Sequence, residues 1–410
     1  MAIVGLSWIC LCSFGAVPLY LSKVVPSYAD AFFEIVSGFT TTGASIFPDV
    51  EILPRGILFW RSLTHWLGGM GIIVLYIALL PSLGSKSYQL YEAETSGLPF
   101  DRIEPRLKDT AKSLWKAYLY FSIILLLLLI IGGVPVFDAL CHMFGTISTG
   151  GFSTKNASLA AYNPYIQWVV IIFMFIGGIN FLLHCHALKG DFRDFLKDEE
   201  FRFYLFLVLF SVGFFALILH FGDISSSPLR DSTFQVVSIL TATGFASTDF
   251  NRWPEVLRIL LVVLMFIGGC GGSTSGGLKI VRFLLCMKIG VQSIVQTIFP
   301  NAVLPVKFNT KPLSEKFLAT VLIYFVGYTS VLVVGAVLFI ITDNCDMVTA
   351  ISASASALGN VGPGLNKVGP MVNYAWVSIP GKWLLSFLML AGRLELYSLL
   401  ILFFPFTWRR

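Results

Sequence analysis

Residues 37–45 read Ser-Gly-Phe-Thr-Thr-Thr-Gly-Ala-Ser, and three related stretches follow at intervals of roughly a hundred residues. They are Gly-Thr-Ile-Ser-Thr-Gly-Gly-Phe-Ser at 145–153, Ser-Ile-Leu-Thr-Ala-Thr-Gly-Phe-Ala-Ser at 238–247 and Ala-Leu-Gly-Asn-Val-Gly-Pro-Gly at 357–364. Each lies between two apolar segments long enough to cross a bilayer. Self-similarity at a regular spacing is the signature of a repeated architecture. The layout therefore predicts four like units around one pore.

An acidic residue precedes the central glycine at the same distance in three of the four stretches. These acids are Asp30, Asp138 and Asp231. In the last stretch the matching position is Thr349, and the nearest acid is Asp346. We expect the three acids at the outer starts of short helices, where a carboxylate can cap free N–H groups. Attraction of cations into an outer vestibule is a second role, compatible with the first.

The composition is that of a membrane protein. Apolar residues make up 56% of the 410 residues and charged residues 12%, against about 25% charged in soluble domains. Windows of about twenty mostly apolar residues can span the hydrocarbon core. They occur near 2–22, 57–80, 114–134, 165–185, 203–221, 256–270, 317–341 and 379–405. The first is longer than the apolar core of a secretory signal, so we expect it to be a retained helix.

Lys and Arg concentrate in the connectors between units and at the C-terminal end. Positive charge marks the cytoplasmic loops of a membrane protein. We therefore expect the glycine stretches to face outside and both termini to be cytoplasmic.

The predicted fold class is an all-α membrane protein with four tandem helix–pore loop–helix units and fourfold pseudosymmetry. The unit boundaries are 1–95, 96–190, 191–300 and 301–410. About ten residues separate the first span of a unit from its central glycine, too few to cross a bilayer at 1.5 Å per residue. Irregular backbone at membrane depth needs shielding by protein or water. The glycine stretches are therefore expected to line an aqueous passage.

Rings of backbone carbonyl oxygens can replace the hydration shell of a cation. Glycine permits the backbone turns that such a ring requires, and the negative ends of short helices favour a cation. The predicted ion-binding residues are Thr41, Thr42, Gly43, Thr149, Gly150, Gly151, Ala242, Thr243, Gly244, Asn360, Val361 and Gly362. We find no enzyme motif, and we predict K⁺ bound at these residues as the only metal.

Nearly the whole chain resembles the TrkH/TrkG and KtrB group of potassium uptake proteins, within the Trk, Ktr and HKT superfamily. The most specific pieces are 37–45, Arg-Ser-Leu-Thr-His-Trp-Leu-Gly-Gly-Met-Gly at 61–71, 147–153, 268–282, 357–365 and Gly-Arg-Leu-Glu-Leu-Tyr-Ser-Leu-Leu at 392–400. Many members carry two further helices before the first pore unit, whereas this chain begins with that unit.

The resemblance implies potassium transport through a filter with one glycine per loop, in the bacterial inner membrane. It also implies a homodimer resting on a cytosolic ring of TrkA-type subunits. Nucleotides such as ATP, ADP and NAD would bind to that partner ring and not to this chain. A sodium–potassium symporter or a less selective cation transporter of the same superfamily remains an alternative.

A glycine run and one arginine are the predicted gate. The run comprises Gly268, Gly269, Cys270, Gly271, Gly272, Ser273, Thr274, Ser275, Gly276 and Gly277. Each glycine costs a helix about 1 kcal/mol, so the span is expected to break there. The resemblance implies that this break is an intramembrane loop that obstructs the pore and moves. A static kink is the alternative.

Arg393 is the one Lys or Arg that we place deep within a span, where a charge is costly and usually faces a pore. It is predicted either to form an electrostatic barrier below the filter or to hold the fourth unit through carbonyl or carboxylate contacts. An alternating-access transporter is a rival class. Such transporters are often built from inverted repeats, whereas the four units here run in one direction.

Overall fold

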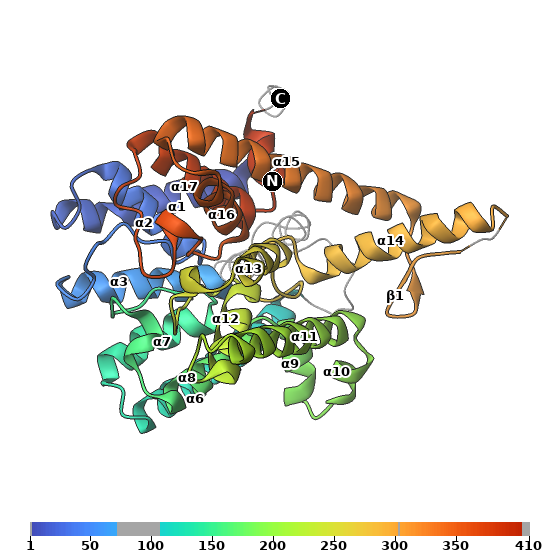
Figure 1. The fold of residues 1–410 in the computed structure, drawn as a ribbon, viewed down its shortest axis with the longest axis horizontal. Coiled ribbons are helices and arrows are strands. Elements are labelled where there is room, and N and C mark those ends of the chain that lie inside the picture. Colours follow the sequence, from blue (N-terminus) through green and yellow to red (C-terminus); the bar gives the residue numbers. More distant parts are fainter. Residues whose placement is uncertain (1, 72–106, 302–303, 404–410) are drawn as a thin grey trace.

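The computed structural model describes residues 2–71, 107–301 and 304–403, which form a bundle of helices (Figure 1). Of the four predicted units, the first contains α1 (Ala2–Leu21), α2 (Tyr28–Phe39), α3 (Arg55–Trp66) and the π-helical turn η1 (Leu67–Gly71). The second contains α6 (Leu107–Ile131), α7 (Val136–Ile147), η4 (Ser158–Ala161), α8 (Pro164–Gly177) and α9 (Phe181–Leu188).

The third unit contains α10 (Arg193–Lys197), α11 (Glu199–Phe221), α12 (Pro228–Leu240), η5 (Phe250–Arg252), α13 (Glu255–Ile267) and α14 (Ile280–Ile298). A hairpin of β1 (Lys307–Phe308) and β2 (Lys311–Pro312) follows. The fourth contains α15 (Glu315–Asp343), α16 (Met347–Gly359), η6 (Asn366–Val368), α17 (Ile379–Arg393), α18 (Tyr397–Leu400) and η7 (Ile401–Phe403). The order of long helix, short helix, glycine stretch and second helix thus occurs four times.

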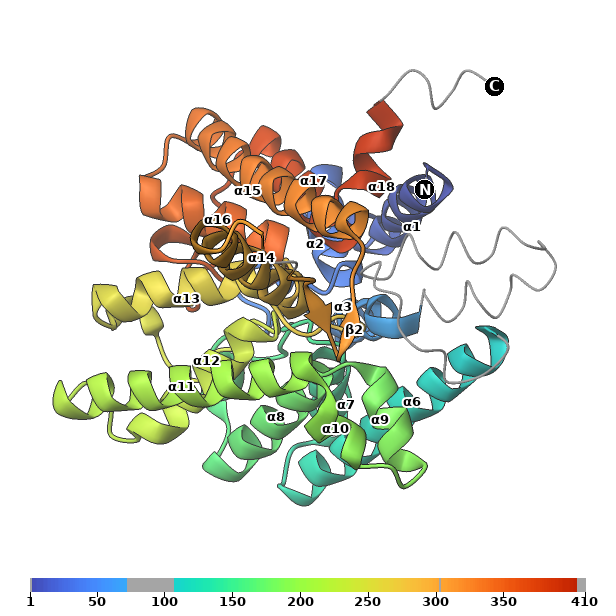
Figure 2. The same ribbon diagram turned by 90° about the vertical axis from the view of Figure 1, so that its right-hand side faces the viewer.

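The helices pack in a closed cycle. The second helix of each unit lies against the short helix of the next, in the pairs α3 with α7, α8 with α12, α13 with α16, and α17 with α2. The last pair joins the fourth unit to the first. One large apolar core is formed mainly by the second and third units and another mainly by the first and fourth (Figure 2). Most residues of the short helices are buried, and the short helices form part of these cores.

The described residues contain five helices long and apolar enough to cross a membrane, or six if the bent pair α8–α9 counts as one. Four of them are the first helices of the units, as expected. The predicted windows at 165–185, 256–270 and 379–405 are instead broken. The α8 helix ends at Gly177 and α9 continues at an angle of 101°, α13 ends at Ile267, and α17 ends at Arg393. Residues 72–80 of the window at 57–80 lie outside the described residues.

The α14 helix was not expected as a span, because Lys279, Arg282 and Lys288 made its sequence look like a connector. It runs for 19 residues and passes the same test of length and hydropathy. In Figure 1 it extends with the β1–β2 hairpin beyond the rest of the bundle. Arg282 is accommodated because its guanidinium bonds the Glu395 carboxylate at 2.5 Å. A buried charge is tolerated when it is paired.

The prediction that Asp30, Asp138 and Asp231 cap their short helices is wrong. The Ser27 side chain caps α2, while Asp30, Asp138 and Asp231 lie within the first helical turn. Asp30 pairs with Lys382 at 2.7 Å, Asp138 accepts from Thr154, and Asp231 accepts from Ser225. Among the four short helices, only α16 is capped by an acid, because the Asp346 carboxylate accepts from the Thr349 amide. A carboxylate in the first turn still favours the helix dipole.

Candidate functional site

The four glycine stretches share one backbone conformation. Each central glycine has a positive φ, with 84° at Gly43, 87° at Gly151, 76° at Gly244 and 103° at Gly362. The residue two places earlier is left-handed in every unit, with φ between 53° and 56° at Thr41, Thr149, Ala242 and Asn360. Left-handed conformations are uncommon for residues with a Cβ. The match includes the fourth unit, whose sequence is the least similar.

The central glycines lie against one another in a ring. A Cβ built on each would fall on the carbonyl oxygen of the residue that precedes the next glycine. The distances are 2.3 Å from Gly43 to Gly150, 2.1 Å from Gly151 to Thr243, 1.9 Å from Gly244 to Val361 and 2.5 Å from Gly362 to Thr42. The fourth contact closes the cycle on the first unit. The structure thus brings all four predicted stretches together, with their backbones too close to admit side chains at the glycines.

Polar side chains behind the ring hold the strands that leave it. The Glu34 carboxylate accepts from the Ile46 amide at 2.8 Å and from the Ser45 hydroxyl at 3.0 Å. At the matching position of the second unit, the His142 ring bonds the Ser153 hydroxyl at 3.0 Å. Gln235 contacts Ser247 in the third unit.

Arg61 is a buried cation next to the glycine stretches that sequence reasoning missed, since Arg393 was expected to be the only deeply placed cation. Its side chain is buried, pairs with Glu34 at 2.6 Å and donates to Ser45 at 3.0 Å. The guanidinium also lies 4.1 Å from the centroid of the Phe152 ring, in the second glycine stretch. The sequence signal that could have identified Arg61 was an arginine inside an apolar window. Its partner Glu34 lies 27 residues away in the sequence, so the pair could not be predicted from local spacing.

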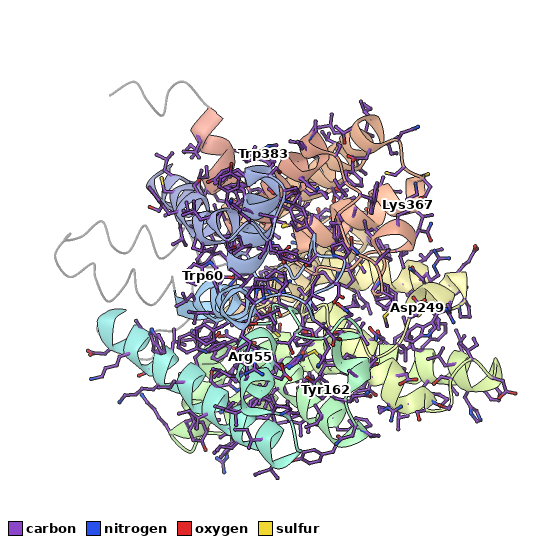
Figure 3. The ribbon with its side chains drawn as sticks, turned by 90° about the vertical axis from the view of Figure 1, so that its left-hand side faces the viewer. Arg55, Trp60, Tyr162, Asp249, Lys367 and Trp383 are labelled. Atoms are coloured by element: carbon purple, nitrogen blue, oxygen red, sulfur yellow. The ribbon has the colours of Figure 1, made fainter. Side chains whose placement is uncertain are left out.

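A cavity of about 160 Å³ adjoins the ring and is lined by all four central glycines. Among the described residues that line it, Arg61 and Lys155 carry charge. Figure 3 shows the molecule from the side on which Arg55, Tyr162, Asp249 and Lys367 lie, one from each of the four repeats. The vestibule role predicted for the acids Asp30, Asp138 and Asp231 is therefore not supported by this lining.

Loops of neighbouring units are joined beside the cavity. Asn156 of the second unit accepts from the Val50 amide at 2.8 Å and donates to the Asp49 carboxylate at 2.7 Å. The hydrogen bond from Asn156, assisted by the Glu51 amide, holds the pKa of Asp49 below its usual value. The carboxylate form of Asp49 thus links the first unit to the second.

The glycine run forms a non-helical loop between α13 and α14, as predicted. Gly268, Gly272 and Gly277 have positive φ, a conformation open to glycine. We call residues 268–279 the intramembrane loop.

The intramembrane loop contacts three of the four short helices at their C-terminal ends. The Thr274 hydroxyl donates to the Ile147 carbonyl at 3.2 Å, and the Ser275 hydroxyl donates to the Thr241 carbonyl at 2.7 Å. A Cβ on Gly276 would lie 2.1 Å from the Gly359 carbonyl. These contacts precede the central glycines in the chain, whereas the cavity is lined by the glycines and residues after them. Loop and cavity therefore lie on opposite sides of the ring.

Arg393 bonds the intramembrane loop and the first unit. Its guanidinium donates to the carbonyls of Thr274 at 2.8 Å, Gly68 at 2.6 Å and Gly69 at 2.9 Å. The predicted carbonyl contact is present, while Glu395 pairs with Arg282 instead. A planar guanidinium suits several acceptors at once. Arg393 thereby ties the end of α17 to the loop and to η1.

Helices that can span a membrane, together with a backbone-lined ring beside a cavity, place the chain in the class of membrane transport proteins. The model of the TrkH family, described as cation transport protein, matches residues 1–409. The chain belongs to this family.

Similar proteins cover almost the whole chain. The Trk system potassium uptake protein TrkH of Salmonella typhimurium is 42% identical over 414 residues, covering 99% of this chain and 85% of the relative. The Trk system potassium uptake protein TrkG of Escherichia coli is 35% identical, with 99% and 84% covered. The crystal structure of the potassium transporter TrkH from Vibrio parahaemolyticus superposes with a TM-score of 0.88 at 38% identity, covering 99% and 85%.

Proposed function

We propose that this chain is the pore-forming subunit of a Trk-type potassium uptake system in a bacterial inner membrane. Its four units would form one central pore with fourfold pseudosymmetry. The observation that carries the proposal is the closed cycle of backbone contacts among the four central glycines. Such a ring presents carbonyl oxygens to a common centre, which is how potassium filters replace water around the ion.

The cycle of helix packing supports the same arrangement, because each unit contacts the next and the fourth contacts the first. The short helices end at the ring, so their partial negative charges face the same centre. A cation is favoured there over an anion. The relatives named as potassium uptake proteins favour K⁺ as the cargo.

The intramembrane loop and Arg393 are proposed as the gate. The loop lies on the side of the ring away from the cavity, across the path of an ion leaving the filter. In this proposal, its bonds to the short helices and to Arg393 hold the loop in a closed position. We further propose a homodimer with cytoplasmic termini, regulated by ATP, ADP or NAD through a TrkA-type partner ring.

Transport by purified protein in liposomes tests the function. We expect uptake of ⁸⁶Rb⁺ or K⁺ to exceed Na⁺ uptake several-fold, because the ring is built from backbone oxygens. Equal Na⁺ uptake would indicate the less selective branch of the superfamily. Uptake of K⁺ that requires Na⁺ on the same side would indicate a symporter.

Substitution of Arg393 separates its two predicted roles. With alanine we expect higher ⁸⁶Rb⁺ flux, because both the positive charge and the bonds to the loop are lost. Lysine keeps the charge but cannot reach all three carbonyls with a planar group. Flux that is high in both variants assigns the effect to the carbonyl bonds, and flux that is high only with alanine assigns it to the charge. Unchanged flux with alanine would remove Arg393 from the gate.

A further inference from the structure

Glu200 is a buried carboxylate at the start of α11 that holds both ends of the intramembrane loop. One of its oxygens, Oε1, accepts from the Gly271 amide at 2.6 Å and from the Val281 amide at 3.0 Å. Its side chain is 1% exposed. Gly271 lies near the start of the loop and Val281 just after its end. A single acceptor therefore fixes the separation between the two ends.

The Val281 amide depends on an acceptor from outside its own helix. Val281 is the second residue of α14, and the first four N–H groups of a helix have no partner within it. Leaving a buried amide without a partner is costly. On the other side of the loop, Thr274 and Ser275 are bonded to the short helices. The loop is thus held from the ring on one side and from Glu200 on the other.

The β1–β2 hairpin fixes the turn of α11 that carries Glu200. Asn309, in the hairpin turn, accepts from the Glu199 amide at 2.8 Å and donates to the Asp198 carboxylate at 2.9 Å. Asp198 is in turn the cap of α11, accepting from the Phe201 amide. Figures 1 and 2 show the hairpin beside α14, directed toward α10 and the start of α11. Asn309 is therefore connected to the loop through Glu199, to which it is hydrogen-bonded, and the adjacent Glu200, which bonds Gly271.

We propose that Glu200 is a positioning residue for the intramembrane loop, and that the β1–β2 hairpin keeps it in place through Asn309. Movement of the hairpin relative to α11 then withdraws the acceptor shared by Gly271 and Val281 and releases the loop. This inference rests on the proposed role of the loop as the gate. It assigns the hairpin, which lies at the end of the molecule away from the cavity, as the point where that gate is controlled.

The test uses the thiol of Cys270, which lies within the loop and is 1% exposed. The parent is the full chain with its six other cysteines replaced by alanine. These are Cys10, Cys12, Cys141, Cys185, Cys286 and Cys345. The rate of Cys270 modification by a methanethiosulfonate reagent is measured on protein in liposomes, and ⁸⁶Rb⁺ and Na⁺ fluxes are measured on the same samples.

We expect Glu200→Ala to raise the modification rate about tenfold or more, because two buried amides lose their acceptor. The ⁸⁶Rb⁺ flux should rise while the ratio of Rb⁺ to Na⁺ flux stays constant, since the ring is untouched. Glu200→Gln keeps an oxygen acceptor and should restore the slow rate. Asn309→Ala should give a smaller rise. Asp191→Ala, at an exposed position before α10, is the matched control and should match the parent.

A parent-like rate in Glu200→Ala, or an equal rise in Asp191→Ala, would overturn the inference. If Glu200→Ala does not fold, Asn309→Ala decides: an unchanged rate counts against the proposal and a raised rate supports it. A parent that conducts no Rb⁺ would instead refute the proposed function, and the Cys270 rates would still show whether Glu200 and the hairpin hold the loop.

Discussion

Replacing Gly244 with alanine is expected to lower ⁸⁶Rb⁺ flux by roughly a hundredfold while the protein still folds. The added Cβ would lie 1.9 Å from the Val361 carbonyl oxygen and 2.7 Å from Pro363. The φ of 76° adds strain for any residue with a Cβ, of the order of 1–3 kcal/mol. The Val361 carbonyl must therefore move, and it belongs to the proposed ring. A displaced oxygen no longer fits the dehydrated ion.

Gly327→Ala is the matched control for this experiment. Gly327 lies within α15, and a Cβ there would meet nothing within 4 Å. Alanine also favours a helix over glycine by about 1 kcal/mol. Flux and apparent melting temperature should both be retained. If Gly244→Ala conducts like the unchanged protein, close packing of the ring is not needed for transport.

Replacing Arg61 with alanine is expected to destabilise the protein by about 3–5 kcal/mol, the usual cost of removing one partner from a buried ion pair. Glu34, which is 0% exposed, would lose its cationic partner and keep only Ser45 and Ile46 as hydrogen-bond partners. The measurement is the apparent melting temperature of purified protein. Arg252→Ala is the control, because Arg252 also pairs with an acid but its side chain is 85% exposed. Exposed pairs contribute little.

The double variant Glu34→Ala with Arg61→Ala shows whether the two residues act together. Removing both leaves no unpaired charge, so the loss should be smaller than the sum of the two single losses. Potassium selectivity should weaken in all three variants, because the strand after Gly43 loses its support. Additive losses with unaltered selectivity would show that the pair does not position this strand.

The repeated backbone of the site could be predicted because glycine has a local requirement. A positive φ at each central glycine is a property of one residue and its neighbours, so the spacing of the glycines already revealed the ring. This held even in the fourth unit, where Asn360 and Pro363 replace the residues of the other stretches. The break of the helix at Gly268 was visible because a run of glycines disfavours a helix.

Long-range partners could not be predicted in this way. Neither Glu34 with Arg61 nor Glu200 with the loop amides can be found from spacing, since their separations in sequence are arbitrary. The bend after Gly177 was missed because the residues on both sides remain apolar. The acids at Asp30, Asp138 and Asp231 were misassigned because a first-turn position and a cap differ by only a few residues.

The central claim is that backbone oxygens from four units bind one cation at the ring, and anomalous scattering from Rb⁺ in a crystal structure tests it most directly. We predict a peak at the centre of the ring, within coordination distance of the carbonyl oxygens of Thr42, Gly150, Thr243 and Val361. The peak should weaken when K⁺ competes and persist in excess Na⁺. An ordered ring without a peak, in protein that transports Rb⁺, would contradict the claim.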